Sequence, residues 1–355
     1  MSEVLLDDME QIVLDGNIPW DELRGRKILV TGATGTVGLA VVRALFTANT
    51  KYGLGIRIVA SGRNCRKTKQ LTECFGAEFV EHDIRYPFIV SGNVDYIFHC
   101  AAVTKSSEMV AHPVEVIETS IKGTENVLAL AREKRVQSMV YLSSMEVYGI
   151  TDSTLAWVTE DDLGYIDLKN PRSCYPESKR ICECLCNCWY SQHGVPVKTA
   201  RLAQTFGAGT PEKDSRVFAQ FARSAIAGKD IILHTEGNSQ GNYCYISDAV
   251  RGLFLLLLKG TDGEAYNIVN PDASMTIRQM AELVADEICE DRVAVIVDKP
   301  EDIEKQGYPP DTTMRLCAEK IEKLGWRPRY GLKEMYQRMI LDWRENTLLC
   351  NLGGN

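Results

Sequence analysis

The segment KILVTGATGTVGLAVVRALF, which begins at Lys27, restricts the fold more than any other part of the chain. A run of β-branched apolar residues leads into three spaced glycines, and an amphipathic pattern follows them. This order predicts a buried strand, a tight turn and a helix, the unit that binds the pyrophosphate of a dinucleotide. Glycine lets a phosphate approach backbone N–H groups at the positive end of the helix. The turn residues expected to hold the dinucleotide are Gly32, Thr34, Gly35, Thr36, Val37 and Gly38.

Strand-like and helix-like segments continue to alternate after this unit. Most of the strand-like runs are apolar throughout, which is typical of parallel sheets covered by helices on both faces. We therefore expect an α/β fold with a Rossmann-type, doubly wound parallel sheet. Its further strands are expected within residues 56–63, 77–84, 94–102, 138–149 and 195–207.

The character of the sequence changes after the sixth strand, where amphipathic helical patterns replace the alternation. We expect a Rossmann domain over residues 27–206 and a smaller, mostly helical C-terminal substrate-binding lobe over 207–345, with 243–258 returning to the Rossmann domain. Residues 1–26 are expected to form an N-terminal helical arm, and 346–355 a tail. A crevice between two such lobes is a usual binding place for a small substrate.

The composition excludes several kinds of partner. The net charge is −8 and no long basic run occurs, so a nucleic-acid footprint is not expected. The longest apolar run, GLFLLLLKG, is far shorter than the about 20 residues of a membrane span, and the first residues lack the pattern of a signal peptide. Twelve cysteines without such a signal indicate free thiols in a reducing compartment. We therefore expect a cytoplasmic protein with no membrane and no nucleic-acid partner.

Four cysteines stand at alternate positions of the segment RICECLCNC, which raises the question of a metal site. Pro176 suits the first position of a helix and no breaker follows it, so a helix is expected, with about 100° between successive residues. Cys182 and Cys186 then share one face, whereas Cys184 and Cys188 point to the opposite side. Thiols divided between two faces cannot close around one ion. No metal site is expected, and the cysteines are interpreted as small packing residues.

Tyr175 and Lys179 lie on one face of the same helix, one turn apart. This pattern is weak evidence by itself, because it occurs often by chance. It gains weight here because a dinucleotide-binding turn precedes it in the same domain. A phenol and an ammonium group at this spacing favour proton transfer beside a cofactor.

The choice between NAD and NADP depends on the end of the second strand. NAD sites usually carry Asp or Glu there, which binds the ribose hydroxyls. This chain has Gly62 followed by Arg63, with Arg66 and Lys67 nearby. The missing carboxylate and the cations favour NADP over NAD; the alternative is that the cations merely face solvent. Further candidate contacts with the dinucleotide are Asp83, Ile84, Ala101 and Ala102, with Asp83 placed to reach the adenine.

Taken together, the motifs resemble those of the extended short-chain dehydrogenase/reductase family, specifically its nucleotide-sugar epimerases, dehydratases and decarboxylases. The resemblance runs from about Lys27 to Trp343 and rests on TGATGTVG, HCAA, YLSSMEVYG, CYPESK and KLGWRP. It implies an internal redox cycle, in which hydride passes from a sugar to the nicotinamide and is later returned. The transient 4-keto sugar would then undergo epimerisation, elimination or decarboxylation.

The resemblance also implies roles for single residues. Tyr175 would take the proton of the sugar hydroxyl, and Lys179 would lower the pKa of that tyrosine and hold the nicotinamide ribose. Ser144 would hydrogen-bond the same hydroxyl. Glu146 matches a glutamate that acts in the later step of the dehydratases and decarboxylases; the alternative is a strand-end carboxylate that holds a loop. Met145 stands where the sugar 4,6-dehydratases would have Asp, which counts against their usual elimination mechanism.

The segment NPRSCYPESKR most resembles the UDP-glucuronate decarboxylase branch, but three positions depart from the family pattern. Gly241 replaces the arginine that contacts the diphosphate, on which the UDP-glucuronate decarboxylases rely. Gln204 and Ser120 each stand where the family usually has an asparagine. In the family, the asparagine at the position of Gln204 also contacts the phosphates. Arg216 and Arg315 are candidates for the missing charge in the substrate site, because guanidinium suits bidentate phosphate contacts. The alternative is that both arginines serve the surface or packing.

These observations leave several functions open. The leading hypothesis is an NAD(P)-dependent nucleotide-sugar epimerase or dehydratase that acts through a 4-keto intermediate. The alternatives are a nucleotide-sugar decarboxylase of the UDP-glucuronate type, an NADPH-dependent reductase of a keto-sugar or small carbonyl, and a non-catalytic dinucleotide-binding protein. The resemblance further implies a homodimer formed through the Tyr-Lys helix.

Overall fold

The computed structural model describes residues 1–63, 72–290, 292–299 and 311–352. Its centre is a seven-stranded sheet with the order β3-β2-β1-β4-β5-β6-β10, in which every neighbouring pair is parallel. The predicted doubly wound sheet is therefore confirmed. Its strands are β1 (Lys27–Thr31), β2 (Arg57–Gly62), β3 (Glu78–Glu81), β4 (Tyr96–His99), β5 (Ser138–Ser144), β6 (Val197–Leu202) and β10 (Ala265–Ile268).

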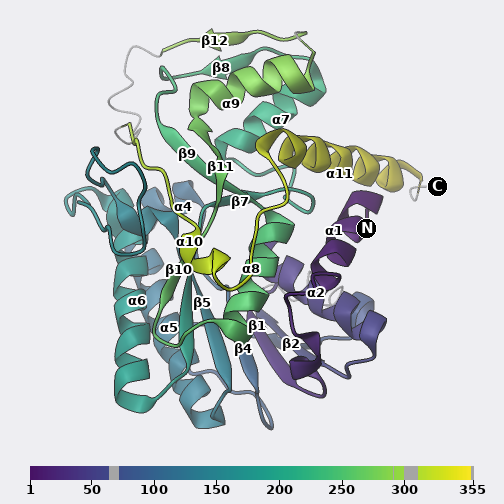
Figure 1. The fold of residues 1–355 in the computed structure, drawn as a ribbon, viewed down its shortest axis with the longest axis vertical. Coiled ribbons are helices and arrows are strands. Elements are labelled where there is room, and N and C mark those ends of the chain that lie inside the picture. The colour runs from purple at the N-terminus through teal and green to yellow at the C-terminus, as the bar shows by residue number, and fades with distance from the viewer. Residues whose placement is uncertain (64–71, 291, 300–310, 353–355) are drawn as a thin grey trace.

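Helices cover both faces of this sheet (Figure 1). Helices α2 (Thr36–Tyr52) and α8 (Ile246–Lys259) pack on one face, while α5 (Pro113–Lys134) and α6 (Cys174–His193) cover the other. Successive residues of a strand point to opposite faces. Accordingly, Ile28 of β1 packs in the core on one side of the sheet and Leu29 in the core on the other side. Burial on both faces explains why the strands read as continuous apolar runs.

The C-terminal lobe contains strands as well as the expected helices. A three-stranded sheet has the order β11-β9-β7, and β12 pairs with β8. Neither small sheet was predicted. The expected sixth strand divides in two, because its first part stays in the central sheet and its second part, β7, pairs with β9. The elements are β7 (Gln204–Phe206), β8 (Ile231–Leu233), β9 (Gln240–Tyr245), β11 (Asn270–Thr276), β12 (Val295–Val297), α7 (Val217–Ala227), α9 (Ile277–Leu283), α10 (Glu319–Glu322) and α11 (Leu332–Leu352).

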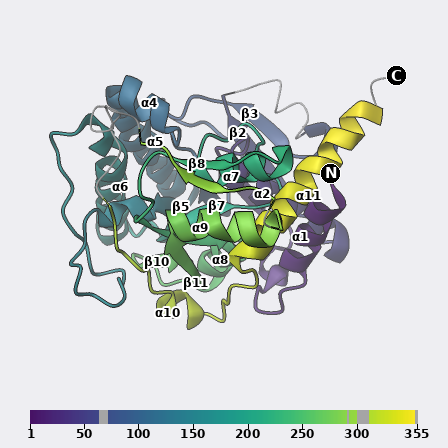
Figure 2. The same cartoon turned by 90° about the horizontal axis from the view of Figure 1, so that it is seen from above.

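The N-terminal helix α1 (Glu3–Val13) packs against α2, α8 and α11, so it lies between both parts of the molecule (Figure 2). Two buried aspartates fix it there. Asp8 accepts a hydrogen bond from Tyr245 at 2.6 Å and forms an ion pair with Arg338, and Asp15 forms an ion pair with Arg251 at 2.5 Å. Across the described ranges, no helix has both the length and the apolar character needed to cross a membrane.

Candidate active site

The glycine turn after β1 leaves no space for a side chain at Gly32 or at Gly38. Gly32 has φ +65°, and an added Cβ would lie 2.7 Å from the backbone nitrogen of Ala101 at the end of β4. At Gly38, an added Cβ would lie 2.4 Å from the carbonyl oxygen of Gly32. Helix α2 begins at Thr36 without a side-chain cap from Gly35, which leaves its first N–H groups for an anion. The turn therefore fits the phosphates of a dinucleotide.

At the far end of the expected dinucleotide site, Arg63 directly follows β2 and is exposed. Asp83 lies nearby and forms an ion pair with Arg85 at 2.6 Å. The hydrogen bond from Arg85 lowers the pKa of Asp83, and the charge of Arg63 acts in the same direction. Ile84 is buried at 7% exposure. Arg66 and Lys67 lie outside the described residues.

Two further dinucleotide candidates end β4. Ala101 and Ala102 are half-buried directly beyond it, and Ala101 donates its N–H to the hydroxyl of Thr31 at 3.3 Å. These alanines therefore lie beside the glycine turn, where the topology of the sheet reverses between β1 and β4. Crevices at such a reversal are the usual dinucleotide sites of doubly wound sheets.

The structure brings Tyr175 and Ser144 together. Tyr175 lies in the first turn of α6 and is 7% exposed, while Ser144 ends β5. Burial raises the pKa of Tyr175, the charge of Glu146 raises it further, and a hydrogen bond with Ser144 acts in the opposite direction. Helix α6 begins at Cys174, two residues before the expected start at Pro176. Proline is tolerated there because the N–H groups of a first turn have no helical acceptor.

Lys179 is also buried, at 3% exposure. Its Nζ donates to the carbonyl oxygen of Leu142 at 2.6 Å and lies 5.9 Å from the centre of the Tyr175 ring. Burial raises the pKa of Tyr175, so the lowering expected from this ammonium group does not determine the direction of the shift. Burial also lowers the pKa of Lys179 itself.

Glu146 faces an arginine that the sequence analysis did not select. Arg172 donates to Glu146 at 2.9–3.0 Å, and its guanidinium carbon lies 5.9 Å from the Tyr175 ring centre. Its position three residues before Tyr175, in the segment NPRSCYPESKR, was the available signal. Glu146 lies in the 3-10 turn Met145–Tyr148 that follows β5, and Arg172 lies in the 3-10 turn Pro171–Ser173 that precedes α6. The sheet and the helix therefore both hold the pair near the phenol.

The substrate candidates divide into two groups. Arg216 precedes α7, pairs with Asp214 at 2.7 Å and lies over the ring of Phe218; its charge is a minor influence that lowers the pKa of Tyr175, which burial raises. Gln204 starts β7 directly beyond the central sheet and is half-buried. Arg315 instead lies over the ring of Trp157 at 4.4 Å. None of the contacts described for Arg315 joins it to Tyr175.

The residues around Gly241 leave no space for the arginine that is usual in the family. An added Cβ at Gly241 would lie 2.1 Å from the hydroxyl oxygen of Tyr243, so the phenol fills the space where a larger side chain would start. The two residues share a face of β9 because they are two positions apart. Tyr243 is fully buried, and its hydroxyl has no hydrogen-bond partner within the described ranges.

Comparison with known proteins places this geometry in a family. Residues 28–269, more than half of the chain, match the family described as NAD dependent epimerase/dehydratase. The chain belongs to this family. It is 33% identical over 322 residues to UDP-glucuronic acid decarboxylase 6 of Arabidopsis thaliana, covering 90% of this chain and 89% of that protein. The expected relationship to nucleotide-sugar enzymes of the extended short-chain dehydrogenase/reductase type is therefore confirmed.

Solved structures of this family share the fold. An epimerase of Methanothermobacter thermautotrophicus superposes with a TM-score of 0.78 at 23% identity, covering 99% of this chain and 98% of that one. UDP-glucose 4-epimerase of Thermotoga maritima gives 0.75 at 21% identity, with 90% and 99% covered.

A buried polar network supports the end of β5, which carries the candidate residue Ser144. Ser143 donates to Glu183 of α6 at 2.5 Å, and Arg201 of β6 donates to the same carboxylate at 2.7 Å. Arg201 also donates to the hydroxyl of Tyr148 at 3.0 Å. Because Tyr148 closes the turn that carries Glu146, the network fixes the segment between Ser144 and Glu146. Long-range contacts of this kind are not visible in a linear motif.

His99 in the HCAA motif is structural. It lies between the hydroxyls of Thr31, at 2.8 Å, and Thr124, at 3.3 Å. Burial lowers its pKa to about 3, and the charge of Lys179 acts in the same direction. His99 is therefore neutral near pH 7 and joins β1, β4 and α5 beneath the glycine turn.

The cysteines of α6 divide as expected. Cys182 and Cys186 are buried, whereas Cys184 and Cys188 are exposed. The described parts of the chain contain no group of three or more His, Cys, Asp or Glu side chains that could hold a metal ion.

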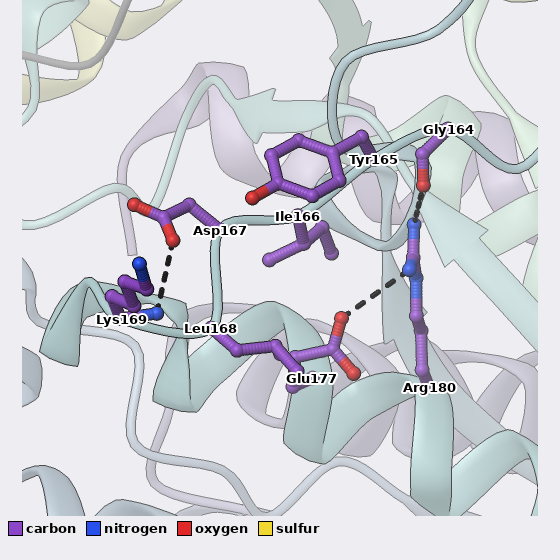
Figure 3. Close-up of a pocket in the computed structure, with 8 residues that line it drawn as sticks. All are labelled: Gly164, Tyr165, Ile166, Asp167, Leu168, Lys169, Glu177 and Arg180. Atoms are coloured by element: carbon purple, nitrogen blue, oxygen red, sulfur yellow. Dashed lines mark hydrogen bonds and ion pairs between the residues drawn. The ribbon is translucent and has the colours of Figure 1, made fainter.

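A hollow of about 500 Å³ lies between residues 164–169 and the first turns of α6 (Figure 3). Arg180 crosses it and donates to the carbonyl oxygen of Gly164 at 2.6 Å and to Glu177 at 3.3 Å. Neither Tyr175 nor Ser144 lines the hollow. Arg180 pairs with Glu177 and holds the loop carbonyl of Gly164, so it serves to anchor the loop to α6.

Proposed function

We propose that this protein decarboxylates a nucleotide-linked uronic acid of the UDP-glucuronate type through a 4-keto intermediate. The observation that carries the proposal is the Glu146–Arg172 pair beside the ring of Tyr175. The 33% identity to a UDP-glucuronic acid decarboxylase supports the choice of substrate. The nucleotide-sugar would lie in the crevice between the sheet and the C-terminal lobe, with Gln204 and Arg216 as contacts.

Each catalytic candidate then has a chemical task. The bound dinucleotide, held by the glycine turn, supplies the acceptor and later the donor of hydride. Tyr175 accepts the proton of the C4 hydroxyl with help from Ser144. Because burial raises the pKa of the phenol, the phenol needs nearby positive charge to release its own proton. Among the described residues, Lys179 and Arg172 each lie 5.9 Å from the centre of its ring, and the charges of Arg172 and Arg216 lower its pKa.

The ketone at C4 makes the neighbouring carboxylate a leaving group. The C5–C6 bond breaks, CO₂ departs, and the electron pair forms an enolate that takes a proton at C5. Arg172 is placed to orient the carboxylate, because guanidinium binds carboxylate with two parallel hydrogen bonds. Glu146, which pairs with Arg172, is placed to transfer the proton that C5 takes up after CO₂ departs.

A 4-epimerase acting on the same substrate class is the second candidate. The observation in its favour is Gly241, since the resemblance associates the decarboxylases with an arginine at that position. The ring of Tyr243 occupies the space instead. In an epimerase, the 4-keto uronate would keep its carboxylate and take the hydride back on the opposite face, which inverts the configuration at C4.

The decisive test is product analysis by NMR after incubation with UDP-glucuronate and dinucleotide. Decarboxylation yields UDP-xylose, and epimerisation yields UDP-galacturonate. Glu146→Gln should slow decarboxylation by about 10²-fold, within the range for loss of a general acid or base. Glu177→Gln, which removes a carboxylate of α6 that is not a candidate site residue, is the control. Equal loss in both variants would refute the role of Glu146.

We also infer a preference for NADP over NAD. Arg63 is exposed at the end of β2, where a carboxylate that would bind the ribose hydroxyls is missing. The family description names NAD, whereas the exposed Arg63 favours NADP. The two observations therefore disagree on whether the dinucleotide carries a 2′-phosphate. Binding of both dinucleotides by calorimetry decides between them. Arg63→Ala should weaken NADP by about tenfold and leave NAD unchanged, because only NADP carries the 2′-phosphate.

We further propose a homodimer formed through α6. Ile181, Cys184 and Cys188 are exposed and follow one another at helical spacing. On the neighbouring helix α5, Val114 and Ile117 are 65% and 39% exposed. Sedimentation analysis should give twice the chain mass of 39.7 kDa, and Ile181→Glu should give the monomer. A monomeric wild-type protein would refute the proposal.

A further inference from the structure

The loop that joins β7 to α7 (residues 207–216) connects two proposed substrate contacts. Gln204 lies in β7, three residues before the loop, and Arg216 is the last residue of the loop. A shift of the loop would therefore move at least one of them. Helix α1 lies outside the part of the chain that matches the family, which begins at residue 28, yet one of its residues reaches this loop.

Asp8 of α1 is joined to the loop by Tyr245, the last residue of β9. Asp8 is fully buried and accepts a hydrogen bond from the Tyr245 hydroxyl at 2.6 Å. The same hydroxyl accepts the backbone N–H of Ala208 at 3.4 Å. The Tyr245 ring also packs on Gly207, where an added Cβ would lie 2.3 Å from the ring carbon Cε2. One phenol thus connects α1 to the first two residues of the loop.

The next two residues of the loop are held by the C-terminal helix α11, which lies beside α1 (Figure 2). The N–H of Gly209 donates to Asp342 at 2.8 Å. The carbonyl oxygen of Thr210 accepts a hydrogen bond from the indole of Trp343 at 2.7 Å. Ser2, which caps α1, donates its hydroxyl to the other oxygen of Asp342. Both terminal helices therefore fix the start of the loop.

The carboxylate of Asp8 is costly for the fold. It pairs with Arg338 at 2.7 Å, but burial raises the pKa of Asp8 to about 6, because desolvation disfavours the charged form. An acid whose pKa is raised by folding lowers stability near pH 7, where it is ionised in both states. Buried ion pairs are also weak evidence for stability. Asp8 is therefore better explained by the position that it gives to Tyr245 than by a gain in stability.

We propose that Asp8 is a positioning residue of the nucleotide-sugar site, which fixes the loop between Gln204 and Arg216 through Tyr245. This role rests on the proposed function, in which these two side chains contact the nucleotide-sugar. None of the contacts described for Asp8 reaches either of them, so Asp8 acts on the ligand only through the loop. When its hydrogen bond is lost, the start of the loop moves more freely and the site holds its ligand less tightly.

Calorimetric titration of the full chain with UDP tests this role, because UDP carries the diphosphate and is not turned over. Asp8→Ala should raise the dissociation constant of UDP by about tenfold and leave that of the dinucleotide within about twofold. In Asp8→Asn, the amide can still donate to Tyr245 and accept from Arg338, so UDP affinity should stay within about threefold of the wild-type value.

Asp15→Ala is the matched control. Asp15 is a second buried carboxylate of the N-terminal arm and pairs with Arg251 at 2.5 Å, but none of its described hydrogen bonds or ion pairs reaches the loop. Its loss should lower the unfolding temperature, as the loss of Asp8 should, because each leaves a buried arginine with fewer partners. The dissociation constant of UDP should stay within about twofold of the wild-type value in Asp15→Ala.

Hydrogen exchange followed by mass spectrometry gives a readout that requires no ligand. The amides of residues 207–210 should exchange faster in Asp8→Ala than in the wild type, and at the wild-type rate in Asp15→Ala. Tyr245→Phe removes only the hydroxyl and should change exchange and UDP affinity in the same direction as Asp8→Ala. This variant decides the question if Asp8→Ala does not fold.

Steady-state kinetics separates positioning from chemistry. With UDP-glucuronate, Asp8→Ala should raise KM by about tenfold and leave kcat within about threefold, the pattern for lost binding that is equal in ground and transition states. Unchanged UDP affinity or unchanged loop exchange in the Asp8 or Tyr245 variants, or equal losses of UDP affinity in Asp8→Ala and Asp15→Ala, would overturn the proposal. Absence of UDP binding by the wild type would instead refute the proposed substrate, and the positioning role with it.

Discussion

The proposed active site has a dinucleotide half and a sugar half, which are built in different ways. The dinucleotide half depends on a turn of seven residues, Gly32 to Gly38, whose shape is fixed by backbone contacts that exclude a Cβ. The sugar half is assembled from Glu146, Arg172 and Arg216, which come from three separate segments. The dinucleotide half therefore depends on local backbone geometry, while the sugar half depends on single side chains brought together from distant parts of the chain.

Tyr175→Phe should separate the two halves most clearly. Loss of the phenolic proton acceptor should lower kcat by about 10³-fold, within the range for general acid–base groups. The ring remains, so the dissociation constant of the dinucleotide should stay within about twofold of the wild-type value. Steady-state kinetics and calorimetry measure the two quantities. Residual activity above one tenth would show that another group takes the proton.

Gly38→Ala should break the dinucleotide half instead. Its Cβ would lie 2.4 Å from the oxygen of Gly32, so the turn must move. We expect the free energy of unfolding to fall by about 1–3 kcal/mol, as for overpacked sites, and dinucleotide affinity to fall by about 10²-fold. Gly16→Ala is the matched control, because an added Cβ there meets no atom within 4 Å. Equal effects in both variants would show that the turn is not closely packed.

Arg216→Ala should affect only the sugar half. Loss of a charged contact with the diphosphate should raise KM for the nucleotide-sugar by about tenfold, with dinucleotide affinity unchanged. Arg315→Ala provides the comparison, since Arg315 lies on Trp157 and has no described contact with the catalytic tyrosine. Its KM should rise by less than about threefold. A reversed order would assign the missing phosphate contact to Arg315.

The same division explains what could be predicted from the sequence. The glycine turn, the alternating strands and the Tyr-Lys face of α6 depend on residues close in the chain, and their periodicity revealed them. Strand β10 was missed because its four residues pair only with β6, far away in sequence. The small sheets of the C-terminal lobe were missed for the same reason.

Individual residues of the sugar half were the hardest to predict from the sequence. Arg172 was quoted within a motif but not selected, because its ion pair with Glu146 spans 26 residues. It could in principle be predicted that the side chain of Tyr243 fills the space beside Gly241, since residues two apart in a strand share a face. That inference required β9 to be recognised as a strand, and its glycine and asparagine conceal the pattern.

Turnover of UDP-glucuronate with a trace of dinucleotide tests the central claim most directly. A proton NMR time course with one molecule of dinucleotide per enzyme should show many molecules of UDP-xylose or UDP-galacturonate formed. Absorbance at 340 nm, the band of the reduced nicotinamide, should show no net change, because hydride returns to the sugar. Product limited to one equivalent of dinucleotide consumed, or no product at all, would contradict the internal redox cycle.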